Sequence, residues 1–200
     1  SELEKRGIRV VTRADKSIYP QKLRLKFKDT GIAIPSVIYY VGELSLVNSF
    51  SAVAVVGSRD LTSDSGTQKF TELFVEKSVQ SGFAISSGGA KGIDHIAEST
   101  SRCCGGISII TVPDSLSKRI LDPEIRNSIL EENSVYLSLT HPNSIFSGYN
   151  AMARNKVIYA LSEYAMIVTC FFLQILAVSL ILIKEELGLV RMNVQNLICQ

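Results

Sequence analysis

Short apolar runs alternate with longer stretches of helical periodicity through most of this chain, and that alternation leaves few folds open. The runs that predict strands are Ile38–Gly42, Ala52–Gly57, Phe83–Ser86, Ile107–Val112, Ser134–Leu139 and Tyr164–Thr169. The stretches that predict helices are Asp64–Gln80, Gly92–Cys103, Pro123–Glu132 and Tyr149–Ser162. Strands joined by helical crossovers lie parallel, and both faces of such a sheet are covered. We therefore expect an α/β fold with a mainly parallel sheet and helices on both faces.

The turn after the third predicted strand is rich in glycine and contains a lysine. It reads Ser-Ser-Gly-Gly-Ala-Lys-Gly-Ile-Asp from Ser86 to Asp94. A strand that turns directly into a helix leaves backbone N–H groups at the helix start, where the helix dipole favours anions. Glycines let a phosphate approach the backbone closely, and Lys91 adds a positive charge. The alternative is a tight turn that binds no ligand.

Two further segments place basic residues where strands end or helices begin. Gly57-Ser58-Arg59 follows an apolar strand, and Arg154-Asn155-Lys156 lies in the N-terminal half of a predicted helix. Ligands of open α/β sheets bind outside the carboxyl ends of the strands, where Arg59 and Lys91 would both lie. Taken alone, Arg59 fits an ordinary surface arginine and the helical segment an ordinary solvated face.

The three segments in this order resemble the DNA-processing protein A family, also called Smf, over roughly Gly7 to Thr169. The family pattern is a strand ending in Gly-Ser-Arg, a Gly-rich turn of this type and a later Arg-Asn-Arg/Lys helix. The resemblance implies a Rossmann-like domain that binds single-stranded DNA, forms a homodimer and helps to load the RecA recombinase during natural transformation. The sequence contains no Gly-x-x-x-x-Gly-Lys-Ser/Thr loop and no Gly-x-Gly-x-x-Gly fingerprint, so we expect no catalytic chemistry and no cofactor. We also expect a cytoplasmic protein.

The resemblance also assigns DNA- or phosphate-binding residues. They are Gly57, Ser58 and Arg59, then Ser87, Gly88, Gly89, Ala90, Lys91 and Gly92, and finally Arg154, Asn155 and Lys156. Asp94 would repel phosphate, so we expect it to hold backbone amides or a basic neighbour at the turn. Single-strand binders also stack bases on aromatic side chains. Phe146 and Tyr149 are candidates for this, although both are expected rather as core or loop anchors.

Composition sets weaker bounds on function. The net charge of this 200-residue chain is +2, so a nucleic-acid site would have to come from a local basic edge. The four cysteines lack metal-ligand spacing, which predicts no metal site and suits a reducing compartment. The basic N-terminal segment reads as a solvated connection. We therefore expect an extension over residues 1–48 and the Rossmann-like domain over 49–200, and the start at Ser1 suits a fragment.

The region that follows Tyr164 is strongly apolar, and after Thr169 it departs from the family. No charged residue occurs from Ala165 to Ile183, a length near that of a membrane-spanning helix. We favour a buried strand at Ala165–Thr169 followed by an apolar helix at Phe171–Leu187, and expect no membrane association. Cys170-Phe171-Phe172-Leu173-Gln174 replaces the family's second Gly-rich turn. A local frameshift is one hypothesis for this change, which would weaken or abolish DNA binding.

Two other functions use the same fold. One is a nucleotide-processing enzyme of the phosphoribohydrolase type, but its Pro-Gly-Gly-x-Gly-Thr-x-x-Glu turn is absent from the sequence. Glu98 and Glu163 are the nearest candidate acids, and both read more simply as exposed helix charges. The other is a nucleotide sensor that would bind a phosphate at the same Gly88–Gly92 turn.

Overall fold

The computed structural model describes residues 2–30, 33–59, 65–169 and 177–182, and the strands within them form one sheet. Its order is β1-β2-β6-β5-β4-β3-β7-β8. The strands are β1 (Arg9–Thr12), β2 (Val37–Gly42), β3 (Ala52–Gly57), β4 (Ala84–Ser87), β5 (Ser108–Val112), β6 (Ser134–Ser138), β7 (Tyr164–Thr169) and β8 (Ala177–Leu182). The helices are α1 (Glu2–Lys5), α2 (Gln21–Thr30), α3 (Leu46–Ser49), α4 (Ser65–Gln80), α5 (Ile93–Cys103), α6 (Leu116–Arg119), α7 (Pro123–Leu130) and α8 (Gly148–Ala160).

The centre of the sheet is parallel. Strands β6, β5, β4, β3 and β7 pair in parallel, whereas β2 on one side and β8 on the other pair antiparallel to this centre. Side chains of β3, β5 and β6 are buried on both faces, which explains their unbroken apolar runs. The expected fold class is confirmed, and the shared predicted elements agree with the structure to within about two residues.

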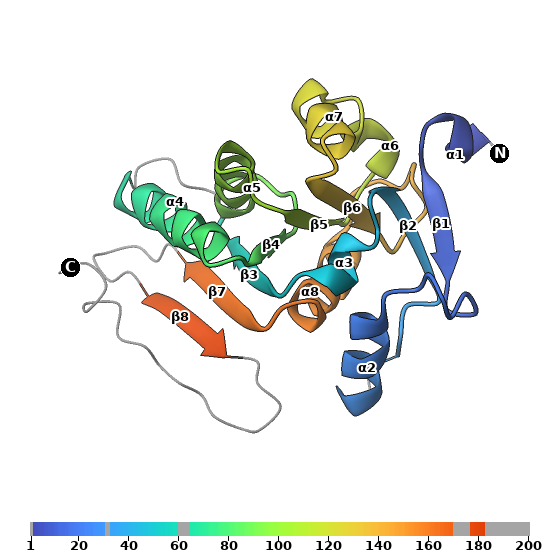
Figure 1. The fold of residues 1–200 in the computed structure, drawn as a ribbon, viewed down its shortest axis with the longest axis horizontal. Coiled ribbons are helices and arrows are strands. Elements are labelled where there is room, and N and C mark those ends of the chain that lie inside the picture. The colour runs from blue at the N-terminus through green and yellow to red at the C-terminus, as the bar shows by residue number, and fades with distance from the viewer. Residues whose placement is uncertain (1, 31–32, 60–64, 170–176, 183–200) are drawn as a thin grey trace.

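Helices cover both faces of the sheet (Figure 1). On one face, Leu23 and Phe27 of α2 and Val157 of α8 pack with alternate residues of the central strands. On the other face, α4 and α5 bury Val75 and Ile93 against β3 and β4. Helices α6 and α7 cover β5 and β6 on that same face through Leu116 and Ile125. The carboxyl ends of the parallel strands therefore form an edge between two helical layers.

The N-terminal segment has more structure than its charge pattern predicted. Residues 9–12 form β1, which pairs antiparallel with β2, and α2 follows. Tyr19, Leu23 and Phe27 are buried, so the segment completes the core beside α8. Lysines and arginines between these apolar residues hide the helical pattern, because the outer face of α2 carries the charges.

The expectation of a helix at Phe171–Leu187 is wrong over the part that the structure describes. Residues 177–182 form β8, which pairs with β7 from Thr169↔Ala177 to Tyr164↔Leu182. The pattern of a short apolar run does not distinguish a strand from a buried helix. Here the run forms a strand, which pairs with the open edge of β7. The Cys170–Gln174 replacement and residues 183–200 lie outside the described residues. Within the described ranges, no helix is both long and apolar enough to cross a membrane.

Candidate functional site

The first two basic motifs lie side by side at the carboxyl edge of the sheet. They follow the neighbouring strands β3 and β4. The Ile93 amide donates to the Ser58 carbonyl over 3.1 Å, and the Ser58 amide donates to the Val168 carbonyl over 3.0 Å. The Ser87 hydroxyl donates to the Val55 carbonyl over 2.8 Å. The start of α5 is thus fixed directly against the end of β3.

Two glycines allow this close approach. A Cβ on Gly92, whose φ is +77°, would lie 2.2 Å from the Ser58 carbonyl oxygen. A Cβ on Gly88 would lie 1.2 Å from Nη1 of Arg154. Gly92 precedes α5 and offers no side chain to cap it. Amides of the first turn of α5 therefore depend on backbone, solvent or a ligand for partners.

Arg154 of α8 crosses the edge of the sheet and reaches Asp94 in the first turn of α5. Its Nη2 donates to Oδ2 of Asp94 over 3.4 Å, and the two residues are only 5% and 3% exposed. The Ala90 amide donates to the same carboxylate over 3.3 Å. Asp94 thus has both kinds of contact that the sequence suggested, an amide and a basic neighbour. The pair joins helices on opposite faces of the sheet across the Gly-rich turn.

Arg154 keeps unused donors in this buried position. Its Nε and Nη1 have no hydrogen-bond partner among the described residues. Burial lowers the pKa of Arg154, the Asp94 carboxylate opposes that shift, and the positive charges of Arg59 and Arg119 lower it further. Burial also raises the pKa of Asp94, against the effects of Arg154 and the Ala90 amide. Arg59 and Arg119 therefore both lie within electrostatic reach of Arg154 at this turn.

The other basic residues of the motifs face solvent. Arg59 and Lys91 are exposed, and the Arg59 guanidinium lies 4.7 Å from the centre of the Phe146 ring. Lys156 is exposed on α8, and Asn155 is partly exposed. Residues two positions apart in an α-helix are about 200° apart around its axis. Lys156 therefore projects away from the side of α8 on which Arg154 reaches the turn.

Arg119 is a basic residue of this edge that sequence reasoning missed. It makes two 3.2 Å contacts with the carboxylate of Asp114. Its Nη1 would lie 3.6 Å from a Cβ on Gly89. Its position shortly after β5 was the available signal, because the carboxyl end of each parallel strand reaches the same edge.

Aromatic and apolar side chains stand beside the basic residues. Tyr149, in the first turn of α8, is 83% exposed, so its expected role as a core or loop anchor is wrong. Phe146 is half-exposed and borders a cavity of about 430 Å³ together with Asp114, Arg119 and Asn143. The buried residues of α8 all lie after Met152, so the first turn of this helix contributes no side chain to the core.

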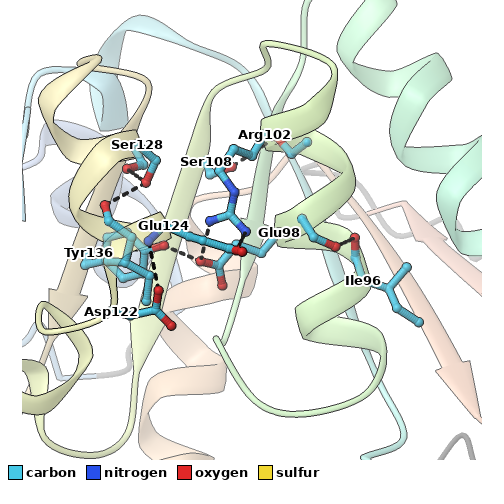
Figure 2. A network of polar contacts seen from close by, with 12 residues as sticks. Ile96, Glu98, Arg102, Ser108, Asp122, Glu124, Ser128 and Tyr136 are labelled. Atoms are coloured by element: carbon cyan, nitrogen blue, oxygen red, sulfur yellow. Dashed lines mark hydrogen bonds and ion pairs between the residues drawn. The ribbon is translucent and has the colours of Figure 1, made fainter.

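Glu98 is buried, and its expected role as an exposed helix charge is wrong. The Tyr136 hydroxyl of β6 donates to its carboxylate, and Arg102 lies 3.8 Å away. Figure 2 shows this network, in which Arg102 also contacts Glu124 of α7 over 3.1 Å. Burial and the nearby Glu98 raise the pKa of Tyr136. All these partners are side chains of the protein, so Glu98 ties α5 to β6. Glu163 is partly exposed just before β7, at the amino edge of the sheet.

Comparison with known proteins identifies relatives of the chain. Residues 9–171 match the family described as DNA recombination-mediator protein A. The protein Smf of Escherichia coli K12 is 30% identical over 159 residues, which are 78% of this chain and 40% of Smf. The chain thus spans less than half the length of that relative.

Solved structures have the same fold. DNA processing protein A from Streptococcus pneumoniae superposes with a TM-score of 0.63 at 26% identity, over 83% of this chain and 56% of that one. The Helicobacter pylori protein, described by its single-stranded DNA binding mode, gives a TM-score of 0.61 at 23% identity over 80% and 68% of the two chains.

Proposed function

Because the chain belongs to the DNA recombination-mediator protein A family, we propose that it binds single-stranded DNA along the carboxyl edge of its sheet. One set of contacts carries the proposal: in a Gly-rich turn that opens a helix without a side-chain cap, Arg154 lies against Gly88, Arg119 lies beside Gly89 and the backbone of Arg59 lies against Gly92. Positive charge and helix-start amides together favour phosphate.

The residues of the edge have different roles in this proposal. Arg59 grips a phosphate with two donors, and Lys91 acts as a point charge. The Ala90 amide donates to Asp94, and the other amides from Gly89 to Gly92 add directional donors. The buried Arg154 holds the turn in place and adds positive charge beneath it. Lys156, on the outer side of α8, contacts a flanking part of the DNA strand. The backbone conformation of this edge is set by Gly57, Ser58, Ser87, Gly88 and Ala90. Asn155 adds a polar contact.

Bases stack beside this line of phosphates. Tyr149 is exposed at the first turn of α8, and Phe146 presents one side of its ring to Arg59 and lies on the wall of the cavity. Base–aromatic stacking tolerates any sequence, because every base has a π-face. This arrangement predicts binding without strong sequence preference.

We propose no catalytic chemistry for the chain. Glu98, one of the two candidate acids of the enzymatic alternative, is bound by Tyr136 and Arg102. Following the family, the chain acts in the cytoplasm as a homodimer that helps to load RecA on single strands during DNA uptake.

Fluorescence anisotropy of a labelled single-stranded oligonucleotide tests the proposal. Wild type, Lys91→Ala and Lys77→Ala are titrated at two salt concentrations. Lys77 is the matched control, because it is an exposed lysine in the last turn of α4, at the other edge of the sheet. We expect Lys91→Ala to weaken binding about tenfold at low salt and to lower the salt slope by about one. Lys77→Ala should behave as wild type.

A mononucleotide competitor separates the alternatives. Failure of the mononucleotide to displace the oligonucleotide supports strand binding. Tight mononucleotide binding without oligonucleotide binding identifies a nucleotide sensor, and loss of the free nucleotide during incubation identifies an enzyme. An unchanged salt slope in Lys91→Ala would remove Lys91 from the interface.

A further inference from the structure

An apolar groove lies on the face of the sheet that carries α6 and α7, and none of the residues proposed above to contact DNA lines it. Its volume is about 600 Å³, and the turn after α1 forms the wall opposite α6 and α7. Figure 1 shows α1, α6 and α7 on the same face of the sheet, with α1 beside β1. The lining residues are Lys5, Arg6, Gly7, Val41, Ser117, Ile120, Leu121, Arg126, Ile129 and Leu130.

The groove exposes leucines that the fold leaves uncovered. Leu121 is 72% exposed and Leu130 77% exposed. Beneath them, Ile120 and Ile129 pack against the core that Val41 and Leu116 share. The floor of the groove is therefore packed against the core, and its two leucines offer apolar area to a partner.

The charges at the groove have one sign. Lys5, Arg6 and Arg126 line it and are exposed, and none of the described lining residues is acidic. Arg6 contacts the exposed Glu2 over 2.9 Å, a bond that water screens and a partner can replace. An apolar floor with a positive rim is complementary to an apolar stripe flanked by carboxylates.

We propose that this groove docks an acidic amphipathic helix of a partner protein. Residues of α6, of α7 and of the segment between them form most of the lining, so recognition proceeds through side chains, as when a helix lies in a groove. Apolar residues at i, i+3, i+4 and i+7 of the partner contact Leu121, Ile129 and Leu130. Its glutamates or aspartates lie against Lys5, Arg6 and Arg126. The interaction is independent of the proposed DNA contacts.

The test uses a synthetic fluorescein-labelled helical peptide with leucines at i, i+3, i+4 and i+7 and glutamates on both sides of that stripe. Its binding to the full chain is followed by anisotropy, with an otherwise identical lysine peptide as control. The groove variants are Leu130→Glu and Arg126→Glu. Leu25→Glu is the matched control, because Leu25 is 61% exposed on α2, on the other face of the sheet. Both groove positions are exposed, so the fold should tolerate these changes.

We expect the glutamate peptide to bind and each groove variant to weaken it at least about tenfold, with Leu25→Glu unchanged. Absence of binding, equal binding of the lysine peptide, or equal weakening by Leu25→Glu would overturn the proposal. So would loss of peptide binding in Lys91→Ala, which would place the peptide on the basic edge. Sedimentation that shows a dimer lost in Leu130→Glu would make a second copy the occupant. Capture on vesicles of equal parts phosphatidylcholine and phosphatidylglycerol, lost in Arg126→Glu, would make it a membrane.

Discussion

Two arginine–carboxylate clusters hold helix α5, and they differ in whether the arginine has hydrogen-bond donors without partners. In the first turn, Asp94 meets Arg154 of α8 over 3.4 Å. In the last turns, Glu98 and Arg102 meet Tyr136 of β6 and Glu124 of α7. Both clusters join α5 to another element, but the first lies at the carboxyl edge of the sheet and the second lies between α5 and α7.

The second cluster uses its polar groups within the protein. Glu98 accepts from Tyr136 and lies near Arg102, and Arg102 also reaches the exposed Glu124. In the first cluster, Nε and Nη1 of Arg154 have no partner among the described residues. Buried donors are normally satisfied, so an exception that persists needs a reason. The proposed reason is that Arg154 provides positive charge for a phosphate at the turn, whereas the Glu98 cluster only joins α5 to its neighbouring elements.

Removing Arg154 should have the largest effect. Arg154→Met leaves the Asp94 carboxylate buried without its counter-ion, which should lower the free energy of unfolding by about 3–5 kcal/mol. Urea denaturation followed by circular dichroism measures this loss. Asp94→Asn in the same chain should recover part of it, because the unpaired charge is then gone.

The matched variant for that comparison is Arg102→Met. The Arg102 side chain is 21% exposed, against 6% for that of Arg154, so water can reach this ion pair more easily, and Glu98 keeps the Tyr136 hydroxyl. The loss should therefore be smaller, about 1–2 kcal/mol. Equal losses for the two arginine variants would show that the clusters do not differ, and the comparison would fail.

Gly88→Ala should have the next largest effect. The new methyl would lie 1.2 Å from Nη1 of Arg154, so the guanidinium or the turn must move. Overpacking of this kind should lower the free energy of unfolding by about 2–3 kcal/mol, and binding of a labelled single strand should fall with it. Gly82→Ala is the comparison variant, because no atom lies near the added Cβ, although its positive φ brings strain of its own. Wild-type oligonucleotide affinity in Gly88→Ala would separate the turn from DNA binding.

The sequence predicted the parallel centre of the fold because each central strand is an unbroken apolar run between helical stretches. The carboxyl-edge rule then placed Gly57–Arg59 next to Gly88–Gly92, and contacts of Ser58 with Ile93 agree with it. Pattern and motif order were sufficient there, since neighbouring parallel strands end at one edge.

Burial of single polar residues could not be predicted in this way. The sequence pattern places Arg154 in a basic surface motif. Its guanidinium is buried instead, because Gly88 has no side chain and leaves room for it. Glu98 reads as an exposed charge, but it lies four residues after Asp94 and meets a tyrosine from a strand 38 residues away. Such pairs depend on three-dimensional contacts between distant segments. For β8 the reason is different, because its apolar run has no period that separates a strand from a helix.

Tyr136→Phe should have the smallest effect and sharpens the comparison through pH. Glu98 keeps Arg102 as a partner, so loss of the hydroxyl should lower the free energy of unfolding at neutral pH by about 1 kcal/mol. Burial and Glu98 raise the pKa of Tyr136, so the unfolded chain loses this proton at lower pH than the folded protein does. The resulting stabilisation is complete below the ordinary tyrosine pKa near 10 and is lost as pH rises through the folded value. Urea midpoints above pH 10 should therefore fall less steeply in Tyr136→Phe than in wild type. Parallel alkaline limbs would show that the hydroxyl is not in the buried network, and the Glu98 cluster would then be as incompletely satisfied as that of Arg154.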